Sequence, residues 1–262
     1  MTRAAALVTG ASSGIGLELA TLLARDRYDL VLVARRRDRL EDIARAFREE
    51  FGIAVTVLPR DLADPDSPRL VAQEVESRGL PIEVLVNNAG LGVYGFFVKT
   101  PLEKERELIQ VNIVALTELT KRLLPGMQSR GRGRILNVAS TAAFQPGPLM
   151  AVYYASKSYV LFFSEALANE LAGTGVTVTA LCPGPTLTEF QTKAGMEETH
   201  LFHSPLVRDV RSVARVGYRG MMRGRRVVVP GLGNKLLAQS VRFSPRRLVT
   251  AIARRIQETR KA

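Results

Sequence analysis

The sequence predicts a single α/β domain built on a doubly wound, parallel sheet of about seven strands with helices on both faces. Short apolar segments alternate with longer amphipathic ones along most of the 262 residues, which is the pattern of repeated β-α-β units. Several apolar segments lack the alternation of a half-exposed strand, as expected of strands that are covered on both sides. No repeat, linker or low-complexity segment divides the chain, so residues 1–262 are expected to form one domain.

The individual elements follow from these patterns. Each predicted strand is a short, mostly apolar run, and the seven are Ala4–Val8, Asp29–Ala34, Ala54–Pro59, Val84–Asn87, Gly133–Ala139, Val176–Cys182 and Arg226–Val229. Each predicted helix has apolar residues at three- and four-residue spacing, and they are Gly14–Arg25, Asp38–Phe51, Ser67–Arg78, Pro101–Leu124, Val152–Ala172, Ser212–Arg223 and Pro245–Glu258.

One long segment, residues 185–211, fits neither the strand nor the helix pattern. A connection of that length inside a domain is usually a lid or a binding loop, so we interpret it as the substrate loop. It carries Phe190, Met196, Leu201 and Phe202, and these side chains favour an apolar substrate.

The composition excludes several classes of protein. The single cysteine, Cys182, cannot form an internal disulfide and fits a reducing compartment. His200 and His203 are the only histidines, and without a Cys/His cluster they do not indicate a metal site. No apolar run reaches membrane-spanning length, and the first one is shorter than a signal-peptide core. We therefore expect a cytoplasmic protein.

The formal charge of +12 is concentrated at one end of the chain. Residues 204–262 contain 15 Lys and Arg against 2 Asp and Glu, whereas residues 1–203 contain 22 against 23. Within the basic C-terminal extension, residues 231–262, Leu248 and Ile252 belong to an apolar stripe that faces away from the arginines of the last predicted helix.

Three interpretations of this extension stay open. The simplest is a surface helix that packs on the domain and leaves its arginines in solvent. The second is a docking surface for an anionic partner, such as a membrane surface, the phosphates of an acyl-CoA or an acidic carrier protein. Nucleic acid is the least favoured partner, because neither a known binding motif nor an aromatic stacking platform accompanies the charge.

A glycine-rich turn follows the first predicted strand and opens the first predicted helix. It reads Thr9-Gly10-Ala11-Ser12-Ser13-Gly14-Ile15-Gly16. Glycines permit a tight turn and let the backbone approach a pyrophosphate, whose charge then lies at a helix N-terminus. The position between a strand and a helix predicts a dinucleotide-binding fold of the Rossmann type. The expected cofactor contacts are Gly10, Ser12, Ser13, Gly14, Ile15 and Gly16.

The end of the second strand indicates which dinucleotide binds. An NAD site usually has an acidic residue there to hold the ribose 2′-hydroxyl, whereas arginine suits a 2′-phosphate. The sequence has Arg35, Arg36 and Arg37, so NADP(H) is favoured over NAD(H) unless these arginines simply face solvent. Further contacts are expected where the next two strands end, and they are Asp61, Leu62, Asn88, Ala89 and Gly90.

Reducing a carbonyl requires a hydride and a proton, and three side chains are candidates for supplying the proton and assisting its transfer. Tyr153 and Lys157 are four residues apart on a predicted helix, so they share one face. An ammonium beside a phenol lowers the phenol pKa from about 10 and makes it a better acid or base at neutral pH. Ser140 ends the fifth strand and can donate to the substrate oxygen. Each residue alone is more often structural, so the prediction depends on their combination.

Together these motifs resemble the short-chain dehydrogenase/reductase family over essentially the whole chain. The family's Thr-Gly-x-x-x-Gly-x-Gly pattern matches Thr9 to Gly16, and its Asn-Asn-Ala-Gly pattern matches Asn87 to Gly90. The residues that match its catalytic positions are Asn112, Ser140, Tyr153 and Lys157. The residues that match its nicotinamide-holding stretch are Pro183, Gly184, Thr186 and Thr188.

The resemblance implies an NADP-dependent oxidoreductase that transfers a hydride between the nicotinamide and a carbonyl or alcohol carbon. Tyr153 would donate the proton, while Lys157 would lower the phenol pKa and hold the cofactor ribose. Ser140 would orient the carbonyl, and Asn112 would support a water that relays protons to Lys157. The C-terminal end resembles, more loosely, carbonyl reductases of the 17β-hydroxysteroid and 3-ketoacyl type.

Two alternatives stay open. A non-catalytic NADP-binding sensor or scaffold could dock an anionic partner through the basic extension, although the complete catalytic set argues against it. A nucleotide-sugar epimerase shares the fold and the Tyr/Lys pair, but such enzymes usually have a larger C-terminal substrate domain. By analogy with the family, we expect a homodimer or homotetramer built on Pro101–Leu124 and Val152–Ala172.

Overall fold

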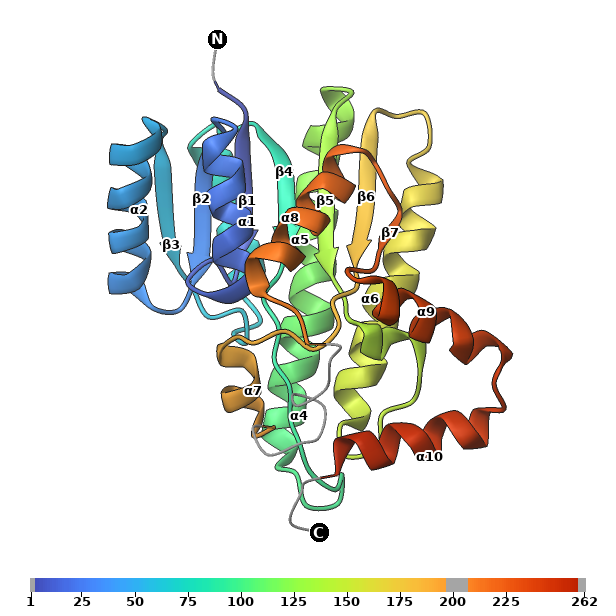
Figure 1. Ribbon diagram of the computed structural model, residues 1–262. Helices are drawn as coiled ribbons and strands as arrows, with labels where there is room; N and C mark the ends of the chain where they lie inside the picture. The colour runs from blue at the N-terminus through green and yellow to red at the C-terminus, as the bar shows by residue number, and fades with distance from the viewer. Residues whose placement is uncertain (1–2, 197–206, 259–262) are drawn as a thin grey trace.

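Seven parallel strands form one sheet in the order β3-β2-β1-β4-β5-β6-β7 (Figure 1). The computed structural model describes residues 3–196 and 207–258. The strands are β1 (Ala5–Thr9), β2 (Asp29–Ala34), β3 (Val55–Pro59), β4 (Ile82–Asn87), β5 (Gly133–Val138), β6 (Val176–Leu181) and β7 (Val227–Val228). The chain runs outward from β1 to β3 and then returns to β4 on the other side of β1. Open α/β sheets bind ligands at such a reversal, beyond the carboxyl ends of the strands.

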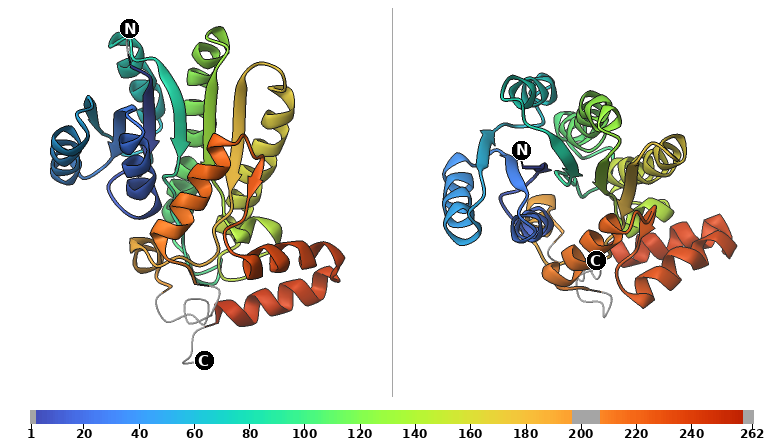
Figure 2. Two further views of the ribbon diagram at one scale, coloured as in Figure 1. Left: turned by 45° about the horizontal axis from the view of Figure 1, so that its top comes forward. Right: turned by 90° about the horizontal axis from the view of Figure 1, so that it is seen from above.

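Helices cover both faces of the sheet (Figure 2). One face carries α1 (Gly14–Arg25), α2 (Arg37–Phe51) and α8 (Val210–Met222), and the other carries α3 (Ser67–Ser77), α5 (Leu116–Ser129) and α6 (Ala151–Glu170). Leu7 of β1 packs with the α3–α5 side and Val8 with the α1–α8 side, and both side chains are fully buried. A strand buried on both faces has no polar positions, which explains the continuous apolar runs. The predicted fold class is confirmed.

The predicted helix Pro101–Leu124 is not one regular helix. It consists of α4 (Leu102–Ile109), a π-helical turn η1 (Gln110–Ala115) and the first part of α5. A π turn is a local insertion in a helix and barely changes the spacing of the surrounding apolar residues, so periodicity does not reveal it. Such turns are frequent at functional sites, and this one carries Asn112.

Four short elements do not follow from the sequence pattern, and they are η2 (Thr141–Phe144), α7 (Glu189–Ala194), α9 (Leu232–Ser240) and η4 (Val241–Phe243). The helix α7 lies within the segment that we interpret as the substrate loop, and its 6 residues are too few to show a helical period. The predicted residues His200, Leu201, Phe202 and His203 lie outside the described residues.

The described part of the basic C-terminal extension forms α9 and α10 (Arg246–Gln257), which lie side by side and run in opposite directions (Figures 1 and 2). They project from the domain at the end where the strand arrows point, and α7 lies at this end too. Three segments from the C-terminal part of the chain therefore stand next to the ligand-binding edge of the sheet. Across residues 3–196 and 207–258, no helix has both the length and the apolarity required to span a bilayer.

Candidate active site

The glycine-rich turn after β1 is held against the loop after β4. Gly10 and Gly14 adopt φ values of 64° and 57°, a left-handed conformation that glycine reaches without strain. The Asn88 amide nitrogen donates to the main-chain oxygens of Thr9 and Gly10, at 2.9 and 3.3 Å. A Cβ on Gly16 would lie 2.4 Å from both Gly10 O and Asn88 Nδ2. Gly16, expected to touch the cofactor, therefore serves this close packing and does not line the adjoining cavities.

Three connected cavities open at the carboxyl ends of the strands. The predicted residues that line the central cavity are Gly10, Ser13, Gly14, Ile15, Asn88, Ala89, Gly90, Ser140, Tyr153, Lys157, Pro183, Gly184, Thr186 and Thr188. Those that line an adjoining arginine cavity are Gly10, Ser12, Arg35, Arg36, Asp61, Leu62, Ala89 and Gly90. A third, apolar cavity shares Ser140, Tyr153 and Gly184 with the central one. The fold thus gathers nearly every predicted residue at one place.

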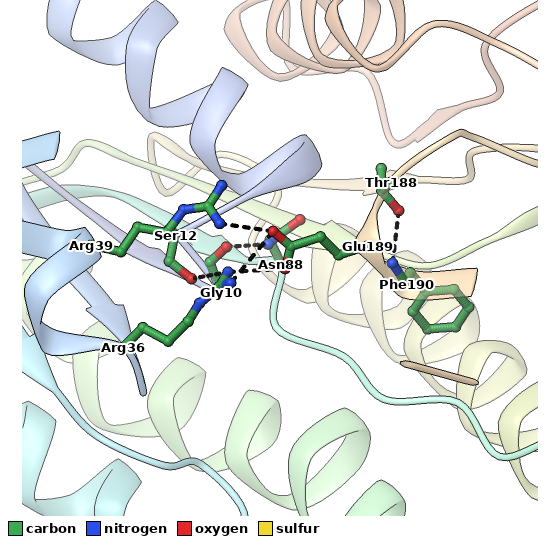
Figure 3. A network of polar contacts seen from close by, with 8 residues as sticks. All are labelled: Gly10, Ser12, Arg36, Arg39, Asn88, Thr188, Glu189 and Phe190. Carbon is green, nitrogen blue, oxygen red and sulfur yellow. Dashed lines mark hydrogen bonds and ion pairs between the residues drawn. The ribbon is translucent and has the colours of Figure 1, made fainter. Parts of the chain in front are cut away.

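Beside the arginine cavity, ion pairs join segments that are far apart in the sequence (Figure 3). Arg36 Nη2 lies 3.0 Å from Glu189 Oε2 and 3.1 Å from Ser12 Oγ. Arg39 Nη1 lies 2.9 Å from Glu189 Oε1. The guanidinium groups of Arg36 and Arg39 therefore both face the Glu189 carboxylate, which lines the central cavity, and such a pair of guanidinium groups also suits the oxygens of a phosphate.

Arg39 and Glu189 are absent from the sequence-based prediction. Arg39 stands about one helical turn after Arg36 at the start of α2, so its spacing offered a signal. Glu189 begins α7, 153 positions away from Arg36, and no local pattern connects the two. The next residue, Phe190, packs on Tyr153 with the ring centroids 5.4 Å apart. The helix α7 thus contacts both the arginine cavity and the catalytic candidates.

Tyr153, Lys157 and Ser140 meet in the wall of the central cavity. Tyr153 and Lys157 project from α6, and Lys157 Nζ lies 5.8 Å from the centroid of the Tyr153 ring. Lys157 donates to the main-chain oxygen of Val138 at 2.9 Å, so β5 holds its ammonium group in place. Ser140, which follows β5, donates to the main-chain oxygen of Pro183 at 3.4 Å. These contacts fix the set between β5 and the loop after β6.

Burial is the main cause of the pKa shifts of Tyr153 and Lys157. It raises the pKa of Tyr153 above the ordinary value of 10.0, and a hydrogen bond with Ser140 opposes the rise in part. Burial also lowers the pKa of Lys157 from 10.5 to about 8. At neutral pH the protein therefore holds Tyr153 as a neutral phenol and Lys157 as an ammonium. The lowered phenol pKa that we expected from Lys157 is not found, because the loss of hydration on burial is the largest effect on Tyr153.

Asn112 lies behind the cavity wall rather than in it. Its side chain is 1% exposed and is held by both its polar atoms. Nδ2 donates to the main-chain oxygen of Leu91 and to Ser156 Oγ, both at 3.0 Å, and Oδ1 accepts from the Leu91 N–H at 2.8 Å. A Cβ on Gly90 would lie 3.4 Å from Asn112 Oδ1 and 3.3 Å from Lys157 Nζ. The glycine therefore leaves a space that both groups border.

The apolar cavity extends from Ser140 and Tyr153 towards α9 and α10. The side chains that make its walls apolar include Met150, Met196, Leu237, Ala238, Ala253 and Ile256. Met196 belongs to the predicted substrate loop, but the residues of α9 and the inner face of α10 were not expected here. Their role depends on how the two helices fold back over the sheet edge, which the sequence pattern does not reveal.

The exposed side chains of α9, η4 and α10 include both apolar and basic ones. Besides Leu237, which also lines the apolar cavity, the exposed apolar residues are Leu232, Leu236, Phe243, Leu248 and Ile252, of which Phe243 is 87% exposed. Leu248 and Ile252 were expected to face away from the arginines, but they are exposed as the arginines are. The exposed basic residues on the same elements are Lys235, Arg242, Arg246, Arg247, Arg254 and Arg255. We refer to these eleven residues as the hairpin face.

Comparison with known proteins agrees with this geometry. A family model described as short chain dehydrogenase matches residues 4–199. The ketoacyl reductase HetN of Nostoc sp. is 35% identical over 184 residues, which cover 70% of this chain. The same alignment covers 64% of HetN, so the chain spans less than two thirds of that relative.

Two solved structures match over nearly the whole chain. A short-chain dehydrogenase from Sphingobium yanoikuyae in complex with NADPH superposes with a TM-score of 0.81 and 35% identity, over 93% of this chain and 97% of that one. The bulky-bulky ketone specific alcohol dehydrogenase from Comamonas testosteroni has a TM-score of 0.78 and 31% identity, over 94% of this chain and 96% of that one. The protein belongs to the short-chain dehydrogenase family of oxidoreductases.

Proposed function

We propose that this protein is an NADP(H)-dependent oxidoreductase that reduces a ketone or aldehyde to an alcohol, or catalyses the reverse, with Tyr153 as general acid/base. One observation carries the proposal: Tyr153 and Ser140 stand where the central cavity meets the apolar cavity. A cofactor in the first cavity and a substrate in the second would adjoin at these two hydroxyl groups. Membership of the family supports the same class of reaction.

Bound NADPH supplies the hydride. In the direction of reduction, Ser140 donates a hydrogen bond to the carbonyl oxygen and orients it. Tyr153 donates its proton to the same oxygen as negative charge develops there. The ammonium of Lys157, held by the Val138 carbonyl, stabilises the phenolate that remains, and it would also bind the cofactor ribose.

Asn112 acts as a positioning residue in this proposal. Its Oδ1 and Lys157 Nζ border the same space beside Gly90, which is open because glycine has no side chain. After each reduction the Tyr153 phenolate must regain its proton, which Lys157 would pass on, and a water bound in this space would then replace the proton on Lys157. The π turn supports this role, because it presents Asn112 toward the loop after β4.

The cofactor is placed by the turn after β1 and by the arginines. In the described structure no side chain caps the first turn of α1, so its N–H groups suit a pyrophosphate. Arg35 and Arg36 favour the 2′-phosphate, and hence NADP(H) over NAD(H). The NADPH complex of the Sphingobium relative supports this choice. The further contacts that we propose are Gly10, Ser12, Ser13, Gly14, Ile15, Asp61, Leu62, Asn88, Ala89, Gly90, Pro183, Gly184, Thr186 and Thr188.

An apolar substrate fits the walls of the apolar cavity. The relatives named for ketoacyl reduction and for bulky ketones support a large carbonyl compound. We also propose that the hairpin face docks on an anionic membrane surface, because amphipathic helices with basic and apolar side chains bind there. Since the inner sides of α9 and α10 wall the cavity, docking would bring a lipid-like substrate close to it. The expected homo-oligomer stays a prediction.

The test combines NADPH turnover with NADPH binding. Purified protein is assayed with apolar ketones, and NADPH binding is followed by fluorescence. Replacing Tyr153 by Phe is expected to lower kcat by about 100-fold or more, with NADPH affinity unchanged. Tyr159→Phe, on the exposed side of the same helix, is the matched control. A wild-type protein that binds NADPH but turns over no ketone or alcohol would instead support the non-catalytic sensor or scaffold.

A further inference from the structure

The apolar cavity contains a buried polar pair, Tyr154 and Gln257, which the proposed chemistry does not use. Tyr154 is 7% exposed and Gln257 is 1% exposed. Gln257 Nε2 donates a hydrogen bond to the hydroxyl oxygen of Tyr154. Within the part of the chain that the structure describes, Gln257 Oε1 has no hydrogen-bond partner.

A buried acceptor without a partner is costly. Leaving one unsatisfied destabilises a protein by about 1–3 kcal/mol, so native structures rarely keep one without a reason. The side chain of Gln257 is almost fully buried, and its main-chain oxygen accepts from the Tyr94 hydroxyl at 2.7 Å, which fastens the end of α10. Its neighbours along the cavity, such as Met150, Ala253 and Ile256, have apolar side chains and cannot satisfy the amide.

The pair offers one acceptor and one donor. Oε1 of Gln257 accepts, and Tyr154, which already accepts from Nε2, keeps its own O–H for donation. A hydroxyl or a secondary amide both donates and accepts, so either group would complement the pair. If the amide of Gln257 is turned over, its Nε2 becomes the free donor, and the same two ligand groups still satisfy it.

We propose that Tyr154 and Gln257 form a recognition site for a hydroxyl or secondary-amide group of the substrate. The site lies in the same cavity as Ser140 and Tyr153, where the carbonyl reacts. The preferred substrate is therefore a ketone with an apolar body and a second polar group remote from the carbonyl. This inference rests on the proposed function, because it assigns the apolar cavity to the substrate.

The experiment compares three ketones of equal length, one unsubstituted, one with a remote hydroxyl and one with a remote N-methylamide. kcat/KM with NADPH is measured for the wild-type protein, Gln257→Leu and the control Gln239→Leu, whose side chain is exposed. The wild-type protein is expected to prefer one of the two polar ketones by about 10-fold or more, the worth of one good hydrogen bond in a buried site. The polar ketone that is preferred identifies the ligand group.

In Gln257→Leu the ratio of kcat/KM between the preferred polar ketone and the unsubstituted ketone is expected to fall to about one, and thermal unfolding checks that the variant is folded. Equal reduction of all three ketones by the wild-type protein, or an equal loss for all three in Gln257→Leu, would overturn the inference and assign Gln257 a structural role. In those cases the unsubstituted ketone is still reduced, so the proposed function stands. If the wild-type protein reduces none of the three, the proposed function fails and the recognition site fails with it.

Discussion

Arg36 and Glu189 form an ion pair of 3.0 Å between Nη2 and Oε2, which joins the end of β2 to the first residue of α7. Arg39 contacts the same carboxylate at 2.9 Å. In the proposed function, Arg36 binds the 2′-phosphate of the cofactor, so the carboxylate and the phosphate compete for it. Because Phe190 follows Glu189 and packs on Tyr153, this competition would also link the cofactor to the proposed general acid/base.

Replacing Glu189 by Gln is therefore expected to strengthen NADPH binding by about 2- to 5-fold, since a solvent-exposed ion pair is worth ~0.2–1 kcal/mol. NADH lacks the 2′-phosphate, so its affinity should change less. Both affinities are measured by fluorescence titration, with Glu74→Gln, which removes an ion pair to Arg78 elsewhere on the surface, as control. Weaker NADPH binding in Glu189→Gln would show that Glu189 holds the arginines in place rather than competing with the phosphate.

The buried ammonium of Lys157 is expected to cost stability. Its folded pKa of about 8 lies below the ordinary 10.5, so folding disfavours the charged form. The cost is complete below the folded pKa and disappears as the pH rises towards the unfolded pKa, because the unfolded chain keeps the proton longer. Lys157→Met should therefore increase the free energy of unfolding by roughly 1–3 kcal/mol at neutral pH, while activity is lost.

The measurement is urea denaturation at neutral pH and again near the unfolded pKa of 10.5. The gain in free energy of unfolding that Lys157→Met has over the wild-type protein should shrink at the higher pH. The exposed Lys235→Met serves as control and should change little at either pH. If the free energy of unfolding of Lys157→Met exceeds that of the wild-type protein by the same amount at both pH values, side-chain packing and not the buried charge causes the difference.

The lowered pKa of Lys157 also predicts how the rate of ketone reduction depends on pH. Tyr153 stays protonated across the neutral range, because burial raises its pKa. Lys157 loses its proton above about pH 8, and with it the charge that stabilises the phenolate. We expect kcat/KM for reduction to fall above that pH. A profile that is flat through this range would exclude the charge of Lys157 from the rate-limiting step.

The hairpin face is expected to bind anionic vesicles. Sedimentation with vesicles that contain phosphatidylglycerol should remove the protein from solution, whereas pure phosphatidylcholine vesicles should not. Each basic residue near an anionic surface contributes about 1 kcal/mol, so Arg246→Glu with Arg247→Glu should weaken binding by about 10-fold or more. Phe243→Ser, which removes the most exposed apolar side chain of the hairpin face, should also weaken it. Vesicle binding that the arginine changes leave intact would contradict this docking surface.

The sequence by itself determined the alternating elements, the glycine-rich turn and the spacing of Tyr153 and Lys157. These features are local: a strand buried on both faces is continuously apolar, and residues four apart on a helix share a face. Residues at the ends of parallel strands also meet at one edge of the sheet, which is why Arg36 and Ser140 could be predicted as parts of one site.

Only the tertiary structure decided the rest. The π turn at Asn112 leaves helical periodicity almost unchanged, so the sequence does not mark it. The contacts of Arg36 with Glu189 and of Tyr154 with Gln257 join segments 153 and 103 residues apart. Such contacts depend on how α7 and α10 fold back over the sheet edge, and a local pattern of residues contains no information about a partner that distant. The walls of the apolar cavity, which we propose as the substrate site, belong to this second group.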